Sequence, residues 1–138
     1  MSVMKGLICK ETDNTLSFGN YTLDVKSKLS DFEFQGDLYK VKTFKEITKL
    51  EKNGLFVYES VPGTVVKHFS DTAKEVKFQV EGLEDAQITL ELEPEQSYEV
   101  YVEEKLLGTM KTNLGGKLSM SVSLDEGKTV PVKVVCIG

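Results

Sequence analysis

Three consecutive runs near the C-terminus decide the fold class: YEVYVEEKLLGTM (98–110), KTNLGGKLSMSVSL (111–124) and DEGKTVPVKVVCI (125–137). In the middle run, apolar residues alternate with serines from Leu118 to Leu124. A period of two is typical of a β-strand with one buried face and one solvated face. Because glycine-bearing turns separate the runs, this part of the chain predicts a β-meander.

The same alternation recurs upstream. Phe32 and Phe34 precede a Gly36-Asp37 turn, and apolar residues alternate again after it. The Gly19-Asn20 pair predicts a tight hairpin between a strand that ends near Phe18 and a strand that begins at Tyr21. Together these signals predict an all-β protein.

The segment TFKEITKLEKNG (43–54) fits two structures. Thr43 with Glu46 matches a helical capping box, and Asn53-Gly54 is a suitable helix stop, so we expect one short helix here. The same Asn-Gly pair is also typical of a type I′ hairpin turn between ITKLEK and LFVYES. The helix is favoured because Ile47 and Leu50 do not share a strand face.

A polar stretch at 70–75, SDTAKE, divides the sequence into two predicted modules. We expect an N-terminal β-rich module over 1–72 and a C-terminal immunoglobulin-like β-sandwich over 73–138. The first holds ten lysines against ten acidic residues, and the second holds seven against twelve, so the net charge of −5 resides in the second. This asymmetry supports the division.

Composition narrows the classes of function. All 17 basic residues are lysines, and the overall charge is acidic, so nucleic-acid binding is not expected. No run is long and apolar enough for a signal peptide or a membrane span, which predicts a cytoplasmic protein without a membrane partner. An exported fragment whose signal has been removed is the alternative. In a cytoplasmic protein, Cys9 and Cys136 are expected to be thiols rather than a disulfide.

No residue pattern predicts catalysis, a metal site or a cofactor. The adjacent acids Glu103-Glu104, Asp125-Glu126 and Glu84-Asp85 lie at strand ends or turns, where carboxylates are usually solvated. His68 is the only histidine, and its neighbours in the sequence offer no nucleophile, so we expect a partly buried structural histidine. We therefore assign no catalytic residue.

Aromatic and apolar residues on exposed strand faces are the candidates for binding. Tyr101 falls on the outward face of its strand if its neighbours Val100 and Val102 face inward. Phe56 and Tyr58 share one predicted strand face. The final strand is apolar on both faces, which adds Val135 and Ile137 to the candidates.

Most of the chain resembles one family of small bacterial proteins. The resemblance is carried by GDLYKVKTFKEITKLEKNGLFVYESVPGT (36–64), AQITLELEPEQSYEVYV (86–102) and GTMKTNLGGKLSMSVSL (108–124). These runs are similar to proteins commonly labelled endosialidase, which implies sialidase-type hydrolysis of a glycan. The C-terminal half is also similar in pattern to the immunoglobulin-like and fibronectin-like domains that accompany carbohydrate-active enzymes.

The residues themselves favour a non-catalytic binding or assembly module. Its expected partner is another protein, a second copy of the chain, or a glycan. A glycan hydrolase and a structural subunit of a larger assembly are the alternative functions.

Overall fold

The computed structural model describes residues 6–72 and 74–138, and this part of the chain is built from antiparallel β-strands without a helix. The strands are β1 (Ile8–Lys10), β2 (Leu16–Phe18), β3 (Ser27–Phe34), β4 (Asp37–Phe44), β5 (Ile47–Lys52), β6 (Leu55–Val61), β7 (Val65–Asp71), β8 (Glu75–Glu81), β9 (Ala86–Glu91), β10 (Ser97–Val102), β11 (Lys105–Lys111), β12 (Lys117–Val122) and β13 (Val130–Cys136). The all-β prediction is confirmed.

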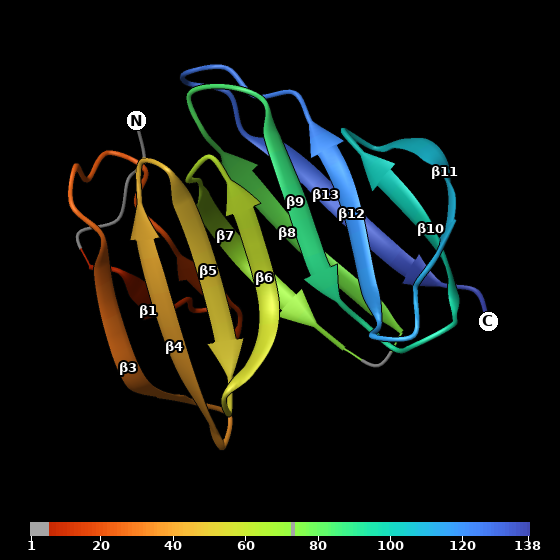
Figure 1. Ribbon diagram of the computed structural model, residues 1–138, viewed down its shortest axis with the longest axis horizontal. Helices are drawn as coiled ribbons and strands as arrows, with labels where there is room; N and C mark the ends of the chain where they lie inside the picture. The colour runs from red at the N-terminus through yellow and green to blue at the C-terminus, as the bar shows by residue number, and fades with distance from the viewer. Residues whose placement is uncertain (1–5, 73) are drawn as a thin grey trace.

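The strands form two sheets that pack face to face, with the six-stranded sheet in front in Figure 1. The seven-stranded sheet has the order β1-β2-β7-β8-β13-β10-β11, and the six-stranded sheet has the order β12-β9-β6-β5-β4-β3. Each sheet turns its apolar side chains toward the other, as in a β-sandwich. The outer faces of both sheets are therefore available to carry function.

The C-terminal runs are strands, as predicted, but they do not form a meander. Among β10, β11, β12 and β13, only β10 and β11 are consecutive strands that pair with each other. β12 pairs with β9 in the six-stranded sheet, and β13 inserts between β8 and β10 in the other sheet. The period-two pattern fixes which side chains face the core, but it does not specify the partner strand, so the predicted pairing is wrong.

The short helix predicted over 43–54 is also wrong, because this segment contains β5 and the hairpin turn to β6. Asn53 and Gly54 both have positive φ, of 52° and 81°, as a type I′ turn requires. The inward face of β5 carries Thr48 and Leu50, both fully buried. The alternation of apolar residues did not indicate this face, because Thr48 is polar although it is buried.

The predicted hairpin at Gly19-Asn20 is absent from the described residues, since residues 19–26 form turns and bends rather than a strand. Gly19 has a φ of 95°, and a Cβ there would lie 2.4 Å from the carbonyl oxygen of Thr64. Gly19 is needed because the backbone at Thr64 passes close to it, and not because a tight hairpin forms at this position.

Four aromatic rings hold the two sheets together. Tyr58 of the six-stranded sheet meets Phe18, Phe69 and Phe78 of the seven-stranded sheet edge to face, with ring centroids 5.3, 6.4 and 5.7 Å apart. These residues come from both sides of the module boundary predicted near residue 72, and each sheet contains strands from both sides of it. The boundary itself coincides with the turn between β7 and β8.

A chain of buried hydroxyl groups lies beside this aromatic cluster. Thr48 Oγ1 donates to the carbonyl oxygen of Thr64 at 3.0 Å and accepts from the Thr64 N–H at 3.0 Å. Thr64 Oγ1 lies 2.9 Å from the Tyr58 hydroxyl, and Thr43 Oγ1 lies 2.8 Å from Thr48 Oγ1. These bonds satisfy polar groups that would otherwise be costly to bury.

Cys9 in β1 and Cys136 in β13 form no disulfide in the described chain, and both are half-buried. Burial raises the pKa of the Cys9 thiol.

Candidate functional site

The outer face of the seven-stranded sheet carries two rows of side chains across neighbouring strands, polar except for Tyr101 in one row and Pro131 in the other. Strand register places Ser70 opposite Lys77, Lys77 opposite Lys133, and Lys133 opposite Tyr101. The adjacent row contains Lys67, Gln79 and Pro131 in the same order of strands. Because the inward residues on these strands are buried valines and aromatic residues, the two rows must face outward.

A hollow of about 370 Å³ surrounds Tyr101 on this face. It is lined by Lys77, Tyr101, Glu104, Pro131, Val132 and Lys133. The ammonium group of Lys133 lies 4.9 Å from the centroid of the Tyr101 ring, within the range of a cation–π contact. The Tyr101 hydroxyl donates to Glu99 Oε1 at 3.1 Å, and this bond raises the pKa of Tyr101.

A second hollow, of about 540 Å³, adjoins the first. It is lined by Asp13, Thr15, His68, Ser70, Lys77, Phe78, Gln79 and Pro131. Lys77 and Pro131 line both hollows, so the two form one continuous surface. We call them the Tyr101 hollow and the His68 hollow, and together they are the candidate binding surface.

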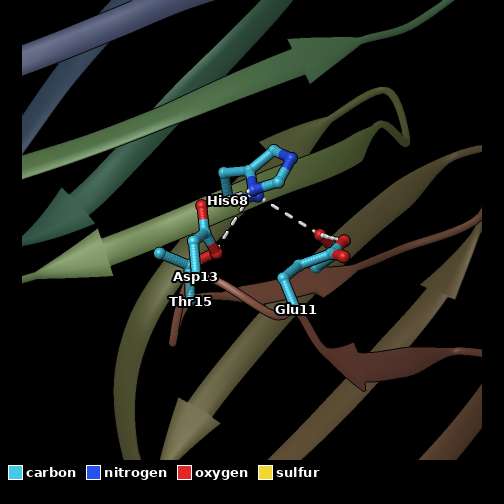
Figure 2. A network of polar contacts seen from close by, with 5 residues as sticks. Glu11, Asp13, Thr15 and His68 are labelled. Carbon is cyan, nitrogen blue, oxygen red and sulfur yellow. Dashed lines mark hydrogen bonds and ion pairs between the residues drawn. The ribbon is translucent and has the colours of Figure 1, made fainter.

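Figure 2 shows the polar network that positions His68. The imidazole Nδ1 lies 2.9 Å from Asp13 Oδ2 and 3.4 Å from Thr15 Oγ1, and the Thr15 hydroxyl donates to the other oxygen of Asp13. The backbone N–H of His68 donates to Ser17 Oγ at 3.2 Å, and the Ser17 hydroxyl donates to Glu11. The loop between β1 and β2 therefore fixes the orientation of a side chain on β7.

The backbone places His68 here through a β-bulge. The pairing of β7 with β8 shifts between Lys67 and Ser70, and His68 has a φ of 54°. Bulges bend a strand and redirect side chains, and they are frequent near functional sites. The ring nitrogen that Asp13 does not hold, Nε2, points away from Asp13 and Glu11 in Figure 2. It can accept or donate a hydrogen bond, depending on its protonation.

Asp13 is the electrostatic partner in this network. Hydrogen bonds from Thr15 and His68, together with the charge of a protonated His68, lower the pKa of the Asp13 carboxyl. An ionised Asp13 favours the His68 tautomer that carries hydrogen on Nδ1 and leaves Nε2 as an acceptor. The Thr15 hydroxyl donates to Asp13 rather than to the ring, so it is not arranged as a nucleophile with His68 as its base.

The predicted binding residues lie on two different surfaces and in the core. Tyr101 lines the candidate surface, and half-buried Val135 lies opposite Glu99 on the same outer face. Ile137 follows β13 and is 52% exposed. Phe56 lies on the outer face of the six-stranded sheet, 4.7 Å beneath the ammonium group of Lys117, whereas Tyr58 is fully buried.

Sequence patterns did not indicate His68 and its partners as a group. Asp13 and His68 are 55 positions apart, and only the pairing of β2 with β7 brings them together. The acidic pair Glu103-Glu104 forms the turn between β10 and β11, where both residues have positive φ. Glu104 reaches the Tyr101 hollow, whereas Glu103 forms an ion pair with Lys128 at 3.2 Å.

Within residues 6–72 and 74–138, no group of three or more histidine, cysteine or acidic side chains is arranged to hold a metal ion. The same residues contain no helix long and apolar enough to cross a membrane.

The fold and surface define an antiparallel two-sheet β-sandwich with an open, polar outer face. No family model, no curated protein and no solved structure matches the chain.

Proposed function

We propose that the chain is a non-catalytic binding module, and that its ligand is a glycan that lies along the outer face of the seven-stranded sheet. The single observation that carries this proposal is the continuity of the Tyr101 and His68 hollows through Lys77 and Pro131. A continuous surface that follows one direction across several strands suits an extended ligand better than a compact one.

The chemistry of the surface supports a ligand rich in hydroxyl groups. Tyr101 and Pro131 supply apolar contact for a sugar ring, and Lys77, Gln79 and His68 offer hydrogen-bond donors and acceptors around it. Glu104 adds an acceptor at one end of the surface, and Asp13 fixes His68 at the other. Polar groups placed around an aromatic side chain fix the orientation of a bound ligand and make its binding specific.

The module also fits the resemblance of its C-terminal strands to immunoglobulin-like accessory domains, which we propose as its structural relationship. In that case the chain would present a glycan to another protein rather than alter it. Leu106 and Leu107 of β11 are exposed and line neither hollow, so a protein partner can contact them while a glycan is bound.

Native affinity electrophoresis tests the proposal with soluble neutral polysaccharides of the cellulose, xylan and galactomannan types. We expect at least one to retard the protein, and we expect Tyr101→Ala to abolish the retardation by removing the apolar platform. Phe56→Ala is the matched control, since Phe56 is a half-buried aromatic residue on the other sheet. Retardation that survives Tyr101→Ala but is lost in Phe56→Ala would contradict the proposed location.

Hydrolysis of a sialic-acid polymer is the rival function, favoured by the carboxyl groups of Asp13 and Glu104 in adjoining hollows. Incubation with polysialic acid, followed by measurement of released sialic acid, separates the two. Turnover that is lost in both Glu104→Gln and Asp13→Asn would establish a hydrolase and overturn the non-catalytic proposal.

A further inference from the structure

Within residues 6–72 and 74–138, the four edge strands of the sandwich differ in how well they are protected against pairing with another chain. β1 has only three residues, β3 contains a bulge with Asp31 at a φ of 59°, and β11 carries Gly108 where its pairing with β10 shifts. β12 pairs with β9 in unbroken register over its whole length. Short length, bulges and charged residues are the usual protection for a sheet edge, and β12 has only Lys117.

The hydrogen bonds of β12 show which backbone groups face outward. The N–H of Leu92 donates to the carbonyl oxygen of Gly116 at 2.6 Å, which makes Gly116 and Leu92 a hydrogen-bonded pair. Such pairs alternate along an antiparallel ladder, so Leu118, Met120 and Val122 bond to β9. The backbone N–H and C=O groups of Ser119 and Ser121 therefore point away from β9, into the open edge.

The side chains of β12 allow this strand to pair with β12 of a second copy of the chain. Leu118, Met120 and Val122 face the core, whereas Ser119 and Ser121 are small, uncharged and exposed on the outer face. Two antiparallel copies keep their faces aligned only when serine lies opposite serine, because a shift by one residue would expose the apolar face. No like charges then face one another across the pair.

We propose that two copies of the chain pair through β12 and form a symmetric dimer in which one sheet continues across both copies. Ser119 of each copy lies opposite Ser121 of the other, with Met120 next to the twofold axis. This register uses the outward N–H and C=O groups of both serines in both copies. A register centred on Ser119 would need the N–H of Lys117, which already donates to Asn113 Oδ1 at 3.0 Å. A register centred on Ser121 would depend on Ser123, which lies beyond the strand.

Exposed leucines border this edge and favour a second copy as the occupant. Leu114, in the connection that precedes β12, is 80% exposed, and Leu106 and Leu107 of β11 are 54% and 53% exposed. Figure 1 places β11 and β12 at the same side of the sandwich. A symmetric contact places Leu114 of both copies beside the same junction, which adds apolar contact to strand pairing that alone buries little apolar surface.

Light scattering coupled to size-exclusion chromatography, over a range of protein concentrations, tests the dimer. We expect a concentration-dependent dimer that Ser119→Pro/Ser121→Pro converts to a monomer, because proline removes only donors that β9 does not use. Ser119→Ala/Ser121→Ala retains both backbone donors and should remain a dimer, and near-ultraviolet circular dichroism checks that each variant is folded. A monomer at every concentration, or a dimer that the proline variant retains, would overturn the proposal.

Oxidative cross-linking tests the register without proline. Residues of a hydrogen-bonded antiparallel pair have Cα atoms about 5.5 Å apart, a distance that a disulfide can span. We expect a mixture of Ser119→Cys and Ser121→Cys proteins to form the cross-linked dimer. Either variant alone should not, which also controls for Cys9 and Cys136. Cross-linking within a single variant, or none in the mixture, would contradict this arrangement.

Discussion

At the scale of single residues, the candidate surface depends on contacts between positions far apart in the sequence. Asp13 holds one nitrogen of His68, and the loop that carries Asp13 is anchored to β7 through Ser17. Sequence reasoning correctly placed Tyr101 on an outward face, since alternation alone determines it. It could not find Asp13 as the partner of His68, because no local pattern records the pairing of β2 with β7.

The lowered pKa of Asp13 predicts a measurable dependence of stability on pH. The folded state favours the ionised carboxyl, so this contribution is fully present above the unfolded value near 3.8 and is lost as pH falls through the lower folded pKa. Urea unfolding should therefore show Asp13→Asn less stable than the unaltered protein near neutral pH, with the difference vanishing in strong acid.

Nuclear magnetic resonance titration of Asp13 supplies the direct control. Thr15→Val removes the hydrogen bond that contributes most to the shift, so the pKa of Asp13 should rise toward its ordinary value in this variant. An Asp13 carboxyl that titrates at or above its ordinary value in the unaltered protein would show that the network does not hold in solution.

At the scale of strands and turns, local signals located most strands but not their partners. The pattern of β12 predicted its buried face correctly, because burial follows directly from alternation. Its pairing with β9 depends on non-local packing, which the pattern does not encode. β5 was missed for another reason: Thr48 is a core residue whose hydroxyl is satisfied by Thr43 and Thr64, so polarity concealed a buried position.

Two glycines near β5 and β6 should respond differently to alanine. A Cβ at Gly63 would lie 2.0 Å from the carbonyl oxygen of Phe44, whereas a Cβ at Gly54 would meet nothing within 4 Å. Gly63→Ala must move the backbone and should cost about 3 kcal/mol or more in the free energy of unfolding. Gly54→Ala is strained only by its positive φ and should cost about 1 kcal/mol. Urea unfolding measures both, and equal effects would contradict the close approach at Gly63.

At the scale of the whole molecule, the two sheets leave three surfaces for function: the polar face that carries both hollows, the opposite outer face, and the open edge at β12. The amino-acid composition and the strand pattern predicted an all-β chain with a sandwich over 73–138, whereas both sheets of the observed sandwich contain strands from each half of the chain. Composition and pattern could not show that Lys77 and Pro131 connect two hollows, since this requires the order of β7, β8, β13 and β10 in the sheet. A ligand along the first surface and a second copy at the edge can be bound together, because they use different sheets.

Mapping of amide chemical shifts shows which face of the sandwich a glycan contacts. The isotope-labelled protein is titrated with an oligosaccharide of whichever polysaccharide retards it in the affinity gels. We predict that the shifts concentrate at Gln79, Tyr101 and Lys133, and extend to His68. Shifts concentrated instead at Lys49, Phe56 and Glu59, on the outer face of the six-stranded sheet, would contradict the assignment of the binding surface.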